Sequence, residues 1–102
     1  MIVIWNQQAI DDRIEIMARR ADYISPTSAF DHDDLIEAKG EALAGVVTYK
    51  RGRIKGTREF VFSAEYIMVY RIDADFVEIL SVVPTAVNWT NSAKKIKLLL
   101  KK

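Results

Sequence analysis

Residues 66–83 read YIMVYRIDADFVEILSVV, and this stretch decides the fold. Two runs within it, 66–72 and 76–83, are rich in β-branched and aromatic residues, which is typical of strands. Asp73-Ala74-Asp75 forms a short polar connection between them, so the two runs are expected to pair as an antiparallel hairpin. A third strand is expected just before the hairpin at 58–62, where Phe60 and Phe62 would share one face.

The N-terminal half predicts one strand and two helices. The apolar run Met1–Trp5 is typical of a short buried strand. A helix is expected next, because apolar residues follow at helical spacing, and it should end at Ser25-Pro26. These apolar residues are Ile10, Ile14, Met17, Ala21 and Ile24. A second helix is expected to begin with Thr27 or Ser28 as its cap and to end near Gly45. Its apolar face would consist of Leu35, Ala38 and Ala42, widened by Ile36 and Leu43.

The chain closes with a lysine-rich helix, capped within residues 90–92. Its apolar face would consist of Ala93, Ile96, Leu99 and Leu100. The expected order is β-α-α-β-β-β-α, and strands grouped after helices indicate an α+β fold with helices on one face of a mainly antiparallel sheet. We expect one domain over residues 1–89, with the helix of residues 90–102 packed on it or extending from it.

Composition excludes several classes of protein. The chain has 102 residues and no cysteine, which excludes disulfides, thiolate zinc sites and cysteine nucleophiles. No stretch approaches the roughly 18 apolar residues of a membrane span. The apolar run at the N-terminus stops at Asn6 and has no basic residues before it, unlike a signal peptide. A small cytoplasmic domain without membrane contact is therefore expected.

Charge is divided unevenly along the chain. Residues 1–49 hold four basic and nine acidic groups, whereas residues 50–102 hold eleven basic and five acidic groups. Such a division indicates either a surface that faces a polyanion or an acidic helical layer packed beside a basic sheet. The sequence leaves both interpretations open.

Familiar catalytic and cofactor motifs are missing. The single histidine lies in Asp31-His32-Asp33-Asp34, but four consecutive helical residues point in different directions and cannot converge on one metal ion. These carboxylates suit the positive end of a helix dipole instead. Gly52 and Gly56 lack the sequence context of a phosphate-binding loop. We expect no metal and no cofactor.

The strongest local signal is a cluster of five cations in nine residues: Lys50, Arg51, Arg53, Lys55 and Arg58. A nucleic acid would relieve their mutual repulsion, although a solvated loop or an acidic partner would also account for them. Tyr66, Tyr70 and Trp89 could stack on bases, or could simply belong to strands and core. Arg71 follows Tyr70, so the two side chains should point to opposite faces of the sheet. The lysines of the last helix suit either a solvated face or a phosphate-facing one.

Taken together, these segments resemble the RelE/ParE family of toxins from bacterial type II toxin–antitoxin modules, over about residues 3–89. The resemblance rests on Ile4-Trp5 with Ala9, Asp12 and Ile16, on Tyr23-Ile24, and on three later segments. These segments are Gly52–Phe60, Tyr66–Ile72 and Val77–Val83, followed by Ala86-Val87-Asn88-Trp89. The family fold, two helices against an antiparallel sheet, agrees with the order derived from the residues.

The resemblance implies a toxin that is neutralised by an antitoxin encoded beside it. RelE-like members are metal-independent mRNA interferases that cut messages on the ribosome, with basic side chains holding the phosphate. By that comparison Arg58 and Tyr70 would be catalytic. RNA or phosphate would be bound by Lys50, Arg51, Arg53, Lys55, Tyr66 and Arg71. ParE-like members share the fold but inhibit DNA gyrase without being enzymes.

Three positions depart from the RelE-like pattern. Ile67 stands where relatives carry a phosphate-binding arginine, and Pro84 and Val87 stand where many carry a histidine and an arginine. These departures remove cationic or proton-transferring groups. The first function that we expect is still a RelE-like ribosome-dependent mRNA interferase, on the strength of the basic cluster. The departures motivate two alternatives: a gyrase inhibitor, or an attenuated toxin that only binds its antitoxin.

Overall fold

The structure is a computed structural model that describes residues 1–45, 51–86 and 89–101. The chain begins with strand β1 (Ile2–Trp5), helix α1 (Gln7–Tyr23) and helix α2 (Pro26–Glu41), which a short 3-10 turn at Ala42–Gly45 prolongs. Strands β2 (Arg58–Val61), β3 (Tyr66–Asp73) and β4 (Phe76–Pro84) follow, and helix α3 (Trp89–Leu100) closes the fold. This order is the predicted one.

The four strands form a single mixed sheet in the order β1-β4-β3-β2. The predicted hairpin of β3 and β4 is confirmed, and β2 pairs antiparallel with β3. Ala74 adopts a positive φ of 48° in the tight turn between β3 and β4. β1 runs parallel to β4, and the connection between the two, which contains α1 and α2, is long enough for the crossover that parallel pairing requires.

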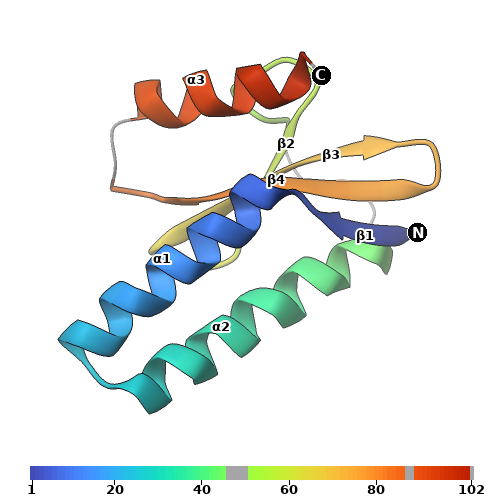
Figure 1. Ribbon diagram of the computed structural model, residues 1–102. Helices are drawn as coiled ribbons and strands as arrows, with labels where there is room; N and C mark the ends of the chain where they lie inside the picture. The colour runs from blue at the N-terminus through green and yellow to red at the C-terminus, as the bar shows by residue number, and fades with distance from the viewer. Residues whose placement is uncertain (46–50, 87–88, 102) are drawn as a thin grey trace.

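Helices cover both faces of this sheet: α1 and α2 lie on one side and α3 lies on the other (Figure 1). The expectation that all helices lie on one face is therefore wrong. Alternation along β3 explains the second layer, since Met68 and Tyr70 point toward α1 and α2 while Ile67 and Val69 point toward α3. Both faces of the central strands are apolar, and each needs its own cover.

The buried face of α1 differs from the predicted one. Ala9 and Ile16 are buried in the core, whereas Ile10 is 37% exposed and Ile14 is 55% exposed. The rotation of α1 is set at its start, where the Asn6 N–H donates to the Ile79 carbonyl at 2.9 Å and the Asn6 side chain accepts from the N–H of Gln8. This junction with β4 turns the regular isoleucine row away from the sheet.

α2 also begins and packs differently from its prediction. Ser25, not Thr27 or Ser28, is the cap, and Pro26 occupies the first turn, where the absent N–H of proline costs nothing. The buried positions of α2 and its 3-10 turn are Ala29, Ile36, Gly40 and Leu43, while Leu35 is 46% exposed. No helix in the described ranges is long and apolar enough to cross a membrane.

Candidate functional site

Four of the five clustered cations lie in the segment of residues 50–57, which we call the basic loop. Over its described residues, 51–57, the loop is held by internal hydrogen bonds. The Gly52 N–H donates to the Thr57 carbonyl at 2.9 Å, and the Thr57 hydroxyl donates to the Ile54 carbonyl at 2.7 Å. Ile54 is buried and anchors the loop to the sheet. Arg51 and Lys55 remain exposed, whereas Lys50 lies outside the described residues.

Arg53 does not stand free in this loop. The buried carboxylate of Glu59 accepts both the backbone N–H of Arg53 at 2.7 Å and its Nε at 3.1 Å. The Arg53 guanidinium carbon also lies 3.6 Å from the centre of the Trp89 ring, at the start of α3. Arg53 therefore joins β2 to α3, and much of its charge is already balanced.

Arg71 is also held by a carboxylate. Its Nε donates to Glu78 at 2.7 Å, and Asn6 donates to the other oxygen of Glu78 at 2.9 Å. Arg71 points to the face opposite Tyr70, as the alternation predicts. The ion pair links β3 to β4 and reduces what Arg71 can offer a phosphate.

The two residues expected to be catalytic lie on the side of the sheet that faces α1 and α2. Tyr70 is 1% exposed and belongs to the core there, so a substrate at the surface cannot touch its ring. Arg58 is opposite Tyr70 in the register of β2 and β3 and shares that face. The structure thus separates Arg58 from Arg53, which faces α3.

Tyr66 is an expected RNA-binding residue that lines a cleft. Its ring lies 6.4 Å from Phe62 in a stacked arrangement and 5.5 Å from the imidazole of His32. Burial raises the pKa of the Tyr66 hydroxyl, and Glu65 adds to that rise. Burial lowers the pKa of His32, and the nearby charge of Arg20 lowers it further.

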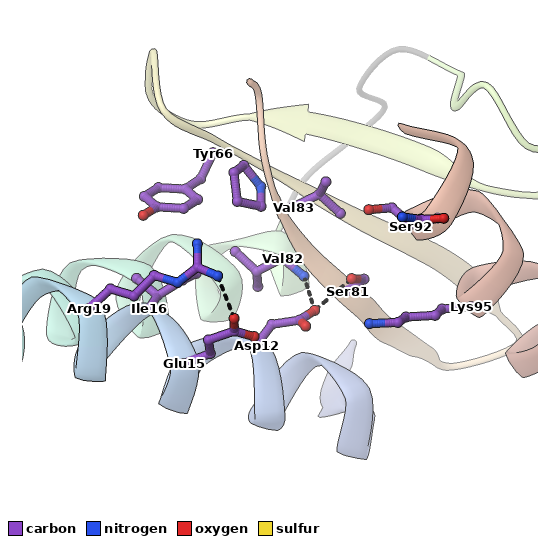
Figure 2. Close-up of a pocket in the computed structure, with 12 residues that line it drawn as sticks. Asp12, Glu15, Ile16, Arg19, Tyr66, Ser81, Val82, Val83, Ser92 and Lys95 are labelled. Carbon is purple, nitrogen blue, oxygen red and sulfur yellow. Dashed lines mark hydrogen bonds and ion pairs between the residues drawn. The ribbon is translucent and has the colours of Figure 1, made fainter. Parts of the chain in front are cut away.

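The cleft beside Tyr66 has a volume of about 450 Å³ and lies between α1, the end of β4 and the first turns of α3 (Figure 2). Its walls are formed by Asp12, Glu15, Ile16, Arg19, Tyr66, Ser81, Val82, Val83, Pro84, Asn91, Ser92 and Lys95. Arg19 and Glu15 form an exposed ion pair at 2.7 Å on one wall, and Lys95 approaches from the other. Positive and negative groups are balanced, which suits a polar partner better than a phosphate chain.

Inside this cleft, Asp12 accepts hydrogen bonds from the edge of β4 that has no neighbouring strand in the described part of the chain. One carboxylate oxygen accepts the Ser81 hydroxyl at 2.6 Å and the N–H of Val82 at 2.9 Å, and the other oxygen accepts the Gln8 amide. Pro84, two residues further along the same edge, has no N–H. A strand added at this edge would find no free N–H here, because Asp12 already accepts that of Val82 and Pro84 has none.

Two of the three departures from the RelE-like pattern, Ile67 and Pro84, fall on described residues. Ile67 is buried beneath α3, and Pro84 is part of the cleft wall. Val87 is outside the described residues. Within the described ranges, no group of three or more histidine, cysteine or carboxylate side chains could hold a metal ion.

Sequence reasoning missed Asp12 and Glu59 as organising residues. Asp12 looks like an ordinary acidic residue near the start of a helix, and its partner Ser81 lies 69 positions further along the chain. Glu59 precedes Phe60 in β2, so its side chain points away from the core that Phe60 joins. Nothing in the local sequence shows that a second core lies on the side to which Glu59 points.

No protein-family model matches the chain, and no curated protein matches its sequence. Among solved structures, the chain is similar to one described as "Chromosomal ParDE TA system from P. aeruginosa", with a TM-score of 0.77 and 19% sequence identity. The match covers 82% of this chain and 95% of the other. The two chains therefore share an α+β fold, as the resemblance to the RelE/ParE family implied.

Proposed function

We propose that this protein is the toxin of a type II toxin–antitoxin module. The observation that carries the proposal is the shared fold, which extends over 95% of a chain from a structure described as a ParDE toxin–antitoxin system. The residue pattern that resembles RelE/ParE toxins supports the same assignment. In this role the protein would act in the cytoplasm and meet its antitoxin there.

We infer further that the toxin acts by binding a protein target, such as DNA gyrase, rather than by cutting RNA. Cleavage through a 2′-hydroxyl needs cations and a proton-transferring group directed at one phosphate. Here the cations Arg53 and Arg71 are paired with Glu59 and Glu78. Tyr70 is enclosed in the core, which removes the candidate for proton transfer.

The antitoxin has a suitable surface on α1. Ile10 and Ile14 are one helical turn apart, and both are exposed on the outside of the fold. Neighbouring exposed apolar side chains of this kind are typical of interaction sites. An amphipathic helix of the antitoxin could cover them with its apolar face.

The test is to induce this protein alone in a bacterial host and to follow growth, a DNA-damage reporter and the integrity of a translated message. Growth arrest with a DNA-damage response and an intact message is the expected result. Arrest without the response would leave a protein target other than gyrase. Absence of arrest would indicate an attenuated toxin that only binds its antitoxin.

A ribosome-dependent mRNA interferase is the second candidate, favoured by the exposed cations Arg51 and Lys55 of the basic loop. This hypothesis predicts new 5′ ends of the mRNA at codon boundaries. These ends should disappear when translation is blocked. Under this hypothesis Arg58→Ala abolishes both the cleavage and the arrest. A cleaved message in the induction experiment would replace our proposal with this one.

A further inference from the structure

The fold places opposite charges on its two outer layers. Residues 7–41, which form α1 and α2, hold nine acidic and four basic side chains, whereas residues 89–102 hold five lysines and no acidic side chain. The sheet separates the two helical layers (Figure 1). The uneven charge of the sequence therefore gives one acidic layer and one basic layer. The basic face has no role in the proposed function.

Three lysines form a row on the outer side of α3. Ile96 is fully buried against the sheet, so the exposed positions Lys94, Lys97 and Lys101 fall on the opposite side. They follow one another at intervals of three and four residues, which places them in one line of about 10 Å along the helix. Within the described residues, none of the three makes an ion pair.

The basic loop extends this row. Ile54 packs in the same cluster as Ile96, and its neighbour Arg53 lies against Trp89 at the start of α3. Lys55, the next residue, is exposed on this loop. Arg53 is fixed there by its contact with Trp89 and keeps 47% of its side chain exposed. We call Lys94, Lys97, Lys101, Arg53 and Lys55 the α3 basic ridge.

We infer that the α3 basic ridge is a docking surface for the phosphate backbone of duplex DNA, independent of base sequence. Among the described residues, four of the five cations of the ridge have no carboxylate partner, and Arg53 shares that of Glu59. Such a line of cations is complementary to the regular negative charge of a duplex. Single strands are bound chiefly by exposed aromatic rings, and Trp89 is covered by Arg53. A membrane would need an apolar face to insert, and the apolar face of α3 is occupied by the sheet.

This inference goes beyond the proposed function and does not depend on it. A protein that binds DNA weakly is concentrated where enzymes that act on DNA are found. Base-specific recognition is not expected, because lysine side chains on one exposed helix face contact phosphates rather than base edges.

The test is fluorescence anisotropy of a labelled DNA duplex titrated with the full chain at several salt concentrations. Four to five phosphate contacts predict a slope of log affinity against log salt of about −4. The variant Lys94→Gln/Lys97→Gln should reduce the steepness of that slope by about 2 and weaken binding at low salt. The folds of the variants are compared by circular dichroism, and both replaced lysines are exposed.

The matched control is Arg19→Gln/Lys39→Gln, which removes the same two charges from the acidic layer. Unchanged DNA binding by this variant would assign the affinity to the ridge. Equal loss in both variants would overturn the inference, because net charge alone would then explain the binding. Tighter binding to an RNA duplex or to vesicles of anionic lipid, or no binding of DNA at low salt, would overturn it as well.

Discussion

Asp12 shows how one side chain can complete a sheet. β1 pairs only with Phe76–Ile79 of β4, and beyond that point a carboxylate from α1 takes the place of a neighbouring strand. The donors that it satisfies belong to Ser81 and Val82, which are both buried. Unpaired buried donors are costly, so Asp12 stabilises the junction of α1 with β4.

Replacing Asp12 by alanine should lower the free energy of unfolding by about 1–3 kcal/mol, because it leaves the Ser81 hydroxyl and the Val82 N–H without their acceptor. Urea unfolding of the variant and of the unaltered chain measures the difference. Asp11→Ala is the control: Asp11 is exposed and accepts the Gln7 amide, so its loss should change stability by less than about 0.5 kcal/mol. Equal effects in the two variants would contradict the role given to Asp12.

His32 makes stability depend on pH near neutrality. Burial and Arg20 lower its pKa below the ordinary value of 6.5, although Glu65 and Asp33 act in the other direction. The unfolded chain therefore binds a proton more readily than the folded chain, so stability falls as pH drops below 6.5. His32→Asn should make the unfolding midpoint less sensitive to pH between about 7 and 5.5. If the midpoint of the His32→Asn variant depends on pH as strongly as that of the unaltered chain, titratable groups other than His32 cause the dependence.

The contact between α2 and β1 depends on a residue without a side chain. A Cβ at Gly40 would collide with the Trp5 indole and press on the Ile79 side chain. Gly40 is thus the place where α2 approaches the sheet closely enough for Trp5 to fit between them. The helix accepts a residue of low helical propensity because packing there outweighs propensity.

Gly40→Ala should destabilise the protein by about 1–3 kcal/mol, since the ring of Trp5 must move in a packed core. Gly45→Ala provides the comparison, because a Cβ at Gly45 meets nothing within 4 Å. That variant should be neutral or slightly more stable, through the lower entropy of its unfolded chain. The midpoints of thermal unfolding of both variants measure the difference in stability. An unchanged midpoint for Gly40→Ala would contradict the prediction and show that the Trp5 ring has room to shift.

Helix α3 is tied to the sheet by packing and by Arg53. Because Glu59 holds the backbone and side chain of Arg53, and Arg53 holds Trp89, the basic loop and α3 should become mobile together. Glu59→Ala should raise amide hydrogen exchange in both segments and lower stability by about 2 kcal/mol. Glu65→Ala, at an exposed position, is the control. Faster exchange in the loop alone would show that α3 is held independently.

The two outer layers give the molecule two surfaces of different character. The α1 layer is acidic with an exposed apolar pair, Ile10 and Ile14, and the α3 layer is basic. Partners of different chemistry can therefore bind without competing for one face. This separation permits a test of where the antitoxin binds.

Ile14→Asp should reduce the amount of antitoxin that co-purifies with the protein by tenfold or more when both are co-expressed, because a charge would be buried in an apolar contact. Leu98→Asp places the same charge at an exposed leucine of α3 and should leave co-purification unchanged. Loss in the Leu98 variant alone would move the antitoxin to the opposite face.

The sequence by itself determined the order of elements, the β3–β4 hairpin and the absence of cysteine chemistry. These features depend on local patterns: β-branched runs, a polar turn, helical spacing and composition. The cluster of cations was also visible, because its members are neighbours in the chain. The pairing of Arg71, outside that cluster, was not visible, since Glu78 reaches Arg71 only through the register of two strands.

Tertiary structure alone decided which helix faces are buried and which charges are free. The regular row at Ile10 and Ile14 looked like the core face of α1, yet the bond between Asn6 and Ile79 turns Ala9 and Ile16 inward. Tyr70 is part of the core because it lies on the face of β3 that α1 and α2 cover, while α3 covers the opposite face. A local pattern specifies the period of a helix or strand, but its rotation and its partners are set by contacts between residues far apart in the sequence.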